Sequence, residues 1–349
     1  MLGSRTPAGR IRVAVIGGGT SPEHDISRTS ADSVAAGLDP RTYEAVPFTL
    51  ARDGGWLDAG GVAYSSFAAA VEALEACDVV FPAVHGAPGE DGALAALCEV
   101  ARIPYVGCSP ATGAMAMHKQ VTKLVAESLG VRTAPGVVLR SRTDPVGLEP
   151  PVVVKPATAG SSLGVSFVAE RDELAPAVDA AFRLSPEVLV ESVITGREIN
   201  TAVLETADGR LHLGEPIEVL LDDKPFFDHE TKYGGTARSR CPAPLTAGER
   251  EGLFGAAERI FRGMGCTGLA RIDFFLTDSG PVLIEVNTMP GFTEGSHYAS
   301  MFGARGITFT RLLDALVTTA LRRRTAVPRA LPEGGEPDGA APPANTLQS

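Results

Sequence analysis

The sequence predicts an α/β protein whose amino-terminal part holds a mostly parallel β-sheet. Short apolar runs typical of buried strands, at residues 12–16 and 79–84, are each followed by a turn and a helical pattern, at 25–38 and 93–101. Strands that alternate with helices are typical of parallel sheets, because a parallel connection needs a long crossover. Residues 104–106 are expected to add a further strand.

Composition limits the possible partners and compartments. The 349 residues are 44% hydrophobic and 21% charged, with a net charge of −11, which argues against nucleic acid or an anionic membrane as the main partner. The five cysteines include no C-x-x-C pair, so a disulfide framework or zinc ribbon is not expected. Without a long apolar run or a signal-peptide pattern, we expect a soluble, cytoplasmic protein.

The middle and the end of the chain change character. A small-residue loop at 159–164 joins two short predicted strands, which suggests a separate lid-like hairpin. Residues 222–240 predict a long functional loop, and the Pro/Gly/Glu-rich end predicts a disordered tail. The remaining expectations are a helical stretch at 110–130, strands at 152–155, 165–168, 188–191 and 198–204, a helix at 312–321, and a loose leader through Arg10.

A hairpin near the carboxyl end carries the sharpest chemical signal. Strands at 270–275 and 282–287 flank a turn at 277–280, and alternation places Arg271 and Asp273 on one face, with Glu285 and Asn287 on the corresponding face of the partner strand. Two carboxylates and an amide oxygen are hard ligands suited to magnesium that also binds nucleotide phosphates. The alternative is a solvated face with a surface salt bridge.

Three other positions have both a functional and a structural interpretation. Lys155 ends an apolar strand, so it must reach solvent or meet an anion, and the Gly/Ser loop after it offers amides and hydroxyls to phosphate. Glu23 follows the glycine turn 17–19, where it either caps a helix or binds an ammonium group. His85 ends a strand of the parallel sheet, where it is either a ligand contact or a hydrogen-bonded structural histidine.

Taken in order, these segments resemble the D-alanine–D-alanine ligases of the ATP-grasp superfamily over about residues 11–322. The resemblance implies a three-domain ATP-grasp architecture, α/β at the amino terminus and α+β in the ATP-grasp part. The implied domains are 1–107 for substrate, 108–191 for the central lid and 192–325 for ATP and metal, with a disordered tail at 326–349. The matching segments are 18–27, 85–92, 103–107, 154–156, 160–164, 195–198, 230–233, 268–273 and 285–291.

The resemblance also implies a role for each matched residue. Those assigned to ATP are the phosphate-binding Lys119, Lys155, Ser162 and Lys232, with Glu191 and Ile194 at the adenine and Glu198 at the ribose. Two magnesium ions, for which manganese can substitute, would be held by Asp273, Glu285 and Asn287. The reaction centre would comprise a Glu23–Ser161–Tyr233 triad, His85 near the first D-alanine, Arg271 and Gly291 as an oxyanion site, and Ser296 with Lys232 at the second substrate's carboxylate.

The implied activity is ATP-dependent joining of two D-alanines for peptidoglycan precursor synthesis, by a cytoplasmic homodimer. Three departures from the family pattern bear on it: His118 stands before Lys119 in place of an aspartate, residues 157–159 lack the usual charges, and His297 lies beside the second substrate's pocket in place of an aliphatic residue. Other second substrates (D-serine, D-lactate or another amine) and a non-catalytic nucleotide-binding protein are the alternatives. Tyr233 favours an amine as the second substrate.

Overall fold

The computed structural model describes residues 9–160, 163–220 and 238–326. Its amino-terminal part is a four-stranded sheet of order β3-β2-β1-β4, in which β1 pairs with both β2 and β4 in parallel. This confirms the predicted parallel sheet. The elements are β1 (Ile11–Gly18), α1 (His24–Gly37), β2 (Tyr43–Leu50), β3 (Trp56–Leu57), α2 (Phe67–Glu75), β4 (Val79–Pro82) and α3 (Ala93–Val100).

Helix α1 packs closely on strand β1. The central residues of β1 are buried, and α1 turns Ser27, Ala31 and Val34 toward them. Gly17 allows this approach, because a Cβ at this position would lie only 2.6 Å from the Cβ of Ala31. The turn after β1 therefore holds the start of α1 over the end of the sheet.

One prediction in this half of the chain needs correction, and the structure refines another. Residues 104–106 do not form a strand but contribute one bridge, between Tyr105 and Val80. Pro104 has no N–H to donate, so the pairing does not extend. The stretch 110–130 is two helices, α4 (Pro110–Met117) and α5 (Lys119–Ser128), because His118 between them has an extended backbone (φ −90°, ψ 97°).

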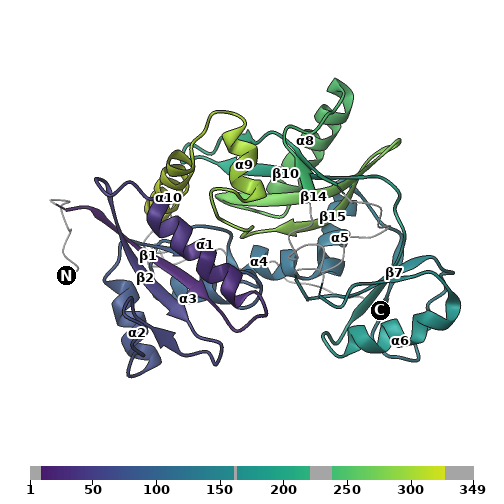
Figure 1. Cartoon of the computed structure of the whole chain (residues 1–349), viewed down its shortest axis with the longest axis horizontal. Coiled ribbons are helices and arrows are strands. Elements are labelled where there is room, and N and C mark those ends of the chain that lie inside the picture. The colour runs from purple at the N-terminus through teal and green to yellow at the C-terminus, as the bar shows by residue number, and fades with distance from the viewer. Residues whose placement is uncertain (1–8, 161–162, 221–237, 327–349) are drawn as a thin grey trace, which may run out of the picture.

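The central lid is a small antiparallel sheet of order β6-β9-β7-β8 with helix α6 against it. It confirms the predicted hairpin on either side of the small-residue loop. In Figure 1 this unit lies at the far end of the molecule from the amino-terminal sheet. Its elements are β6 (Gly136–Leu139), β7 (Val152–Pro156), β8 (Ser166–Val168), α6 (Arg171–Phe182) and β9 (Val188–Ser192).

A third sheet carries the predicted metal hairpin. Its order is β13-β12-β10-β14-β15-β5, with β11 paired to β10. Helix α8 packs against Ile199, Ile272 and Phe274 on one face, and α9 lies against β10 on the other. The elements are β5 (Arg132–Thr133), β10 (Arg197–Glu205), β11 (Leu211–Leu213), β12 (Ile217–Leu220), β13 (Arg238–Arg240), α8 (Ala247–Gly263), β14 (Leu269–Thr277), β15 (Gly280–Asn287), α9 (His297–Gly303) and α10 (Phe309–Ala326).

The last helix returns to the amino-terminal sheet. Leu312, Leu316 and other apolar residues of α10 share one core with Val13 and Val15 of β1. Figure 1 shows α10 beside α1. The domain boundaries remain a prediction, although α10 packs with the first unit rather than with the metal sheet alone. Within the described residues, no helix is long and apolar enough to cross a membrane.

Candidate active site

One face of the third sheet gathers the predicted metal ligands. In the register of β14 and β15, Asp273 lies opposite Glu285 and Arg271 opposite Asn287. A bulge shifts the register between Asp273 and Phe274, so that Phe274 pairs with Leu283. Extra residues of this kind bend a strand and aim its side chains. The predicted alternation is therefore confirmed on the Arg271/Asp273 side, and the bulge starts where the carboxylates meet.

Arg271 forms a buried, two-pronged pair with Asp273. Its Nε donates to Oδ1 at 2.8 Å and its Nη2 to Oδ2 at 2.7 Å. Burial works against the charged guanidinium, but the Asp273 carboxylate outweighs it and holds the pKa of Arg271 above its usual range. Because the two side chains are only 13% and 4% exposed, the surface-salt-bridge alternative is wrong. Such paired guanidinium–carboxylate contacts are directional and strong.

The donor set of this face fits a hard divalent cation. The Nδ2 of Asn287 lies 3.1 Å from Oδ2 of Asp273, so these two side chains can reach the same ion after rotation of the amide. Glu285 is the cross-strand neighbour of Asp273. Among the described residues no group of three or more His, Cys, Asp or Glu side chains forms a metal-binding cluster. Two carboxylates and an amide leave coordination positions for water and phosphate oxygens, as magnesium requires.

In the lid, Lys155 meets a protein carboxylate. Its Nζ lies 2.5 Å from Oε2 of Glu191, and Lys123 of α5 contacts the other oxygen of the same carboxylate. Lys119 donates to the carbonyl of Ala159 in the small-residue loop. The two predicted ATP residues Lys155 and Glu191 are thus brought together, and Lys123, which sequence reasoning missed, joins them. Lys123 could have been identified from its spacing of four residues from Lys119, because residues four apart lie on the same side of a helix.

His85 is buried and both of its ring nitrogens are hydrogen-bonded, which fits its structural interpretation, and its contact with the first D-alanine stays a prediction. Its Nδ1 lies 2.9 Å from the Met289 carbonyl, so Nδ1 carries the proton, and Nε2 accepts from the Ser30 hydroxyl at 2.8 Å. The Phe292 amide donates to the same hydroxyl at 3.2 Å. Burial lowers the pKa of His85. This chain of bonds ties the end of β4 and helix α1 to the segment that carries Gly291.

The Glu23 carboxylate lies between two loops. A Cβ at Gly86 would be 3.1 Å from its Oε2, and one at Gly160 would be 3.3 Å away. Glu23 precedes α1 at the N-cap position, but its side chain makes no capping bond. The structure therefore places Glu23 beside the loop that leads into Ser161. Ser161, Ser162, Lys232 and Tyr233 lie outside the described residues, so the triad and the Lys232 contacts remain predictions.

Glu90 also links the amino-terminal loop to the Gly291 segment, and sequence reasoning did not identify it. Its Oε2 accepts from the Gly86 amide at 2.8 Å and its Oε1 from the Met289 amide at 3.3 Å. Burial, with the negative charge of Glu23, raises the pKa of Glu90 to about 8. Met289 is thus held at its N–H by Glu90 and at its carbonyl by His85.

The second-substrate side contains an unexpected amide. Asn200 of β10 lies opposite Asp273 and has its Oδ1 3.1 Å from Nδ1 of His297. The Nδ2 of Asn200 is buried and has no hydrogen-bond partner among the described atoms. Ser296 is the N-cap residue before α9 and donates to the Thr293 carbonyl. Asn200 could have been identified from the sequence, because residues two apart on a strand share a face and Asn200 lies two residues after Glu198. Asn200 extends the row of Asp273 and Glu285 toward His297.

Three other predicted residues lie on β10 or in connecting segments, and their roles stay predictions. Glu198 of β10 shares the face of Asn200, and Ile194 lies in the connection from β9 to β10. Gly291 lies in the segment between β15 and α9. His118 has its Nε2 3.3 Å from a carboxylate oxygen of Glu187.

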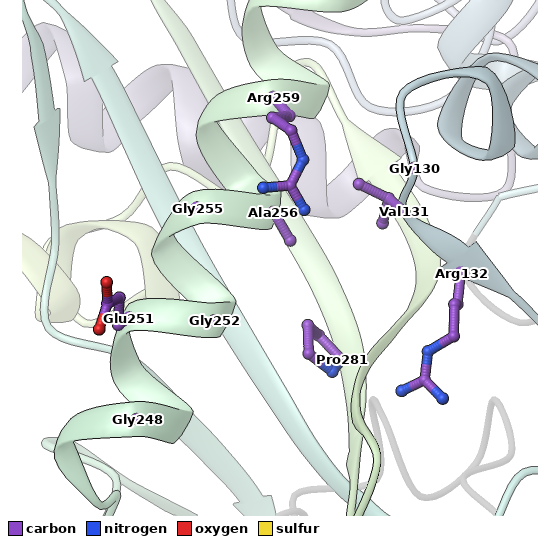
Figure 2. Close-up of a pocket in the computed structure, with 10 residues that line it drawn as sticks. All are labelled: Gly130, Val131, Arg132, Gly248, Glu251, Gly252, Gly255, Ala256, Arg259 and Pro281. Atoms are coloured by element: carbon purple, nitrogen blue, oxygen red, sulfur yellow. The ribbon is translucent and has the colours of Figure 1, made fainter.

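A separate pocket of about 520 Å³ lies on the opposite, α8 side of the third sheet. Figure 2 shows Arg259 and Arg132 on either side of it, with Gly248, Gly252 and Gly255 along the helix. None of the predicted site residues lines it. The predicted site is therefore not this pocket but the surface between the third sheet, the lid and the amino-terminal loops.

Solved structures of similar fold define the class of protein as an ATP-dependent ligase of the ATP-grasp fold. A D-Ala:D-Ser ligase from Enterococcus faecalis superposes with a TM-score of 0.76 at 31% identity, covering 89% of this chain and 100% of that one. A D-alanine–D-alanine ligase from Bacillus anthracis, solved in complex with ATP, gives 0.75 at 27% identity, with 90% and 99% covered.

Sequence comparison gives the family. Models of the amino- and carboxyl-terminal parts of D-ala D-ala ligases match residues 12–108 and 142–318. D-alanine–D-alanine ligases from Mycolicibacterium vanbaalenii and Nocardia farcinica are each 40% identical to the chain, over 91% of it and 99% of their own length. The chain belongs to the D-alanine–D-alanine ligase family, which confirms the resemblance seen in its motifs.

Proposed function

We propose that the protein joins two D-alanine molecules into D-alanyl-D-alanine, for peptidoglycan precursor synthesis in the cytoplasm. The observation that carries this proposal is the convergence of three units. The Glu23 carboxylate lies beside Gly160 of the lid loop that follows Lys155, and His85 bonds to Met289, two residues after Asn287 at the end of the hairpin that carries Asp273 and Glu285. The family supplies the substrates, and these contacts support the proposed position of the site.

The chemistry has two steps. The carboxylate of the first D-alanine attacks the γ-phosphorus of ATP, giving D-alanyl phosphate and ADP. The neutral amine of the second D-alanine then attacks the acyl carbon; phosphate leaves with the electron pair of the broken C–O bond, and the ammonium proton passes to solvent. Phosphoryl transfer depends mainly on positioning and charge neutralisation, which suits a site of lysines and hard oxygen ligands.

Individual roles follow from the family resemblance. Glu23 binds the ammonium of the first D-alanine, with Ser161 and Tyr233 completing the triad, and Arg271 with the Gly291 amide faces the developing oxyanion. Asp273, Glu285 and Asn287 would hold two magnesium ions, which would supply neutralisation of phosphate charge when bound. Lys119, Lys155, Ser162 and Lys232 hold the phosphates, while Glu191, Ile194 and Glu198 bind the nucleoside. Ser296 and Lys232 receive the second carboxylate. We expect the enzyme to act as a homodimer.

A specific observation favours a second candidate, in which the second substrate is D-serine. The buried Nδ2 of Asn200 has no hydrogen-bond partner among the described residues, and its Oδ1 lies 3.1 Å from Nδ1 of His297, so a hydroxyl-bearing side chain would find a polar neighbour there. One similar solved structure is a D-Ala:D-Ser ligase. D-alanine remains the main proposal, because the curated relatives are D-alanine–D-alanine ligases.

The test is phosphate release by the purified protein with ATP, magnesium and one amino acid at a time, with products identified by mass spectrometry. We expect release with D-alanine and none above background with L-alanine. Competition between D-alanine, D-serine and D-lactate then ranks the second substrates. ATP binding without turnover on any D-amino acid would contradict the ligase assignment, and preference for D-lactate at neutral pH would contradict the dipeptide product.

A further inference from the structure

Helix α5 presents two lysines to the lid, one turn apart. Lys119 reaches the carbonyl of Ala159 in the loop after β7, whereas Lys123 reaches the carbonyl of Ala134 at 2.5 Å and the Glu191 carboxylate. Lys119 therefore lies where the ATP phosphates are predicted to bind, and Lys123 lies where the adenine base is predicted to bind. Residues four apart on a helix project to the same side.

The Glu191 carboxylate is almost completely enclosed between two ammonium groups. Its side chain is 6% exposed, and those of Lys123 and Lys155 are 12% exposed. Gly136 on the neighbouring strand makes room for it, because a Cβ there would lie 2.8 Å from Cγ of Glu191. Burial acts to raise the pKa of Glu191, but the two lysines outweigh it, and the pKa lies below the usual range.

The two lysines have different freedom to leave this carboxylate. Lys155 is on β7, next to the loop that continues through Ala157 and Ala159 toward the phosphate-binding residues. Lys123 is also bonded to the Ala134 carbonyl, in the connection between β5 and β6. A phosphate ligand can therefore draw Lys155 away, whereas Lys123 keeps a second contact that fixes it beside Glu191. A buried carboxylate that lost both cations would be strongly destabilised.

We propose that Lys123 is a positioning residue for nucleotide selection, which keeps Glu191 ionised and oriented toward the base while Lys155 binds phosphate. An ionised, correctly aimed carboxylate accepts from the exocyclic amine of adenine but is repelled by the carbonyl that replaces that amine in hypoxanthine. Lys123 would thus support preference for ATP over ITP without touching the nucleotide. This proposal rests on the proposed contact of Glu191 with adenine, and it assigns to Lys123 the task of keeping Glu191 in the ionised and oriented state that this contact needs.

The experiment measures binding of ATP and ITP by calorimetry, without D-alanine, to the wild-type protein and to Lys123→Met. We expect ATP to bind the variant about tenfold more weakly, the scale of one hydrogen bond to a charged group, and ITP to change less than about twofold. Lys119→Met is the matched control on the same helix. Because Lys119 lies at the predicted phosphate site, its substitution should weaken the binding of ATP and ITP by similar factors and leave the ATP:ITP affinity ratio unchanged.

A Glu191→Gln background keeps the test valid if Lys123→Met folds poorly. A neutral amide needs no cation, so Lys123→Met in that background should fold and should leave the ATP:ITP ratio unchanged, as a double-mutant cycle requires when one residue acts through the other. The proposal would be overturned if Lys123→Met alone left the ATP:ITP affinity ratio unchanged. It would also be overturned if Lys123→Met changed that ratio as much in the Glu191→Gln background as it does in the wild-type protein. Nucleotide binding is measured without amino acids, so the result does not depend on whether the chain ligates D-alanine.

Discussion

At the scale of single residues, the backbone of Met289 is held by side chains at both its N–H and its carbonyl. Glu90 accepts from its N–H and His85 donates to its carbonyl, so two side chains of one loop fix the segment that leads to Gly291. An oxyanion site depends on such fixed donors, because they need not reorganise as charge develops. Glu90 acts through this segment and is a positioning residue.

Glu90 predicts a pH dependence of stability. Its pKa is raised to about 8 from 4.5, so between these values the folded chain holds a proton that the unfolded chain has lost. The stability contributed by the protonated group is complete below pH 4.5 and is lost as the pH rises through 8. Relative to Glu90→Gln, the wild-type free energy of unfolding should fall by roughly 3–4 kcal/mol between pH 5 and pH 8, at about 1.4 kcal/mol for each pH unit over which only the folded chain holds the proton. Urea unfolding of both proteins at each pH measures this, and a difference independent of pH would disprove it.

The sequence predicted those site residues whose placement follows from strand alternation. Arg271, Asp273 and their partners lie on one face because β14 and β15 are regular up to the bulge. The bonds of Glu90 could not be predicted in the same way, since they join residue 90 to the Met289 amide across the fold. The pairing of Lys155 with Glu191 likewise depends on the register of β7 against β9.

At the scale of elements, apolar runs located most of the predicted strands but did not fix where helices break. His118 is the example: the pattern at 110–130 continues through it, yet its backbone is extended and separates α4 from α5. The amide of Lys119 then donates to the Ala157 carbonyl at 2.9 Å, a tertiary contact that competes with helix continuation. Propensity alone does not record such contacts.

Packing of Phe292 should anchor the segment that carries Gly291. Its ring is 1% exposed and contacts Phe81, Tyr298 and Phe309, which come from three other elements or connections. Phe292→Ala should lower the free energy of unfolding by about 3–5 kcal/mol, through lost burial and the cavity left behind. Phe67→Ala is the control, because Phe67 is 59% exposed and should change stability by no more than about 1 kcal/mol. Equal effects in denaturant unfolding would contradict this anchoring role.

At the scale of the whole molecule, the two ends of the described chain form one core. Tyr43 donates to Asp314 at 2.6 Å, and Arg323 donates to the carbonyls of Tyr105 and Gly107 at 2.8 and 2.9 Å. Helix α10 thereby fixes the amino-terminal sheet, which carries Glu23 and His85, relative to the sheet that carries the predicted metal ligands. The amphipathic pattern at 312–321 predicted this helix, but not the partner for its apolar face, which depends on contacts far apart in sequence.

A substitution at Gly37 tests how closely helices α1 and α10 pack against each other. A Cβ there would lie 2.7 Å from two ring atoms of Phe309 and 2.8 Å from Leu313, so α1 and α10 touch where only glycine fits. Helix propensity alone favours alanine by about 1 kcal/mol, but Gly37→Ala should instead destabilise the protein by about 1–3 kcal/mol, the usual cost of overpacking. Gly252→Ala is the matched control: its Cβ would lie 3.8 Å from Pro281, an ordinary contact, so propensity should prevail and stability should rise. Thermal unfolding should therefore move the two variants in opposite directions, and a gain in both would mean that the two helices are free to separate.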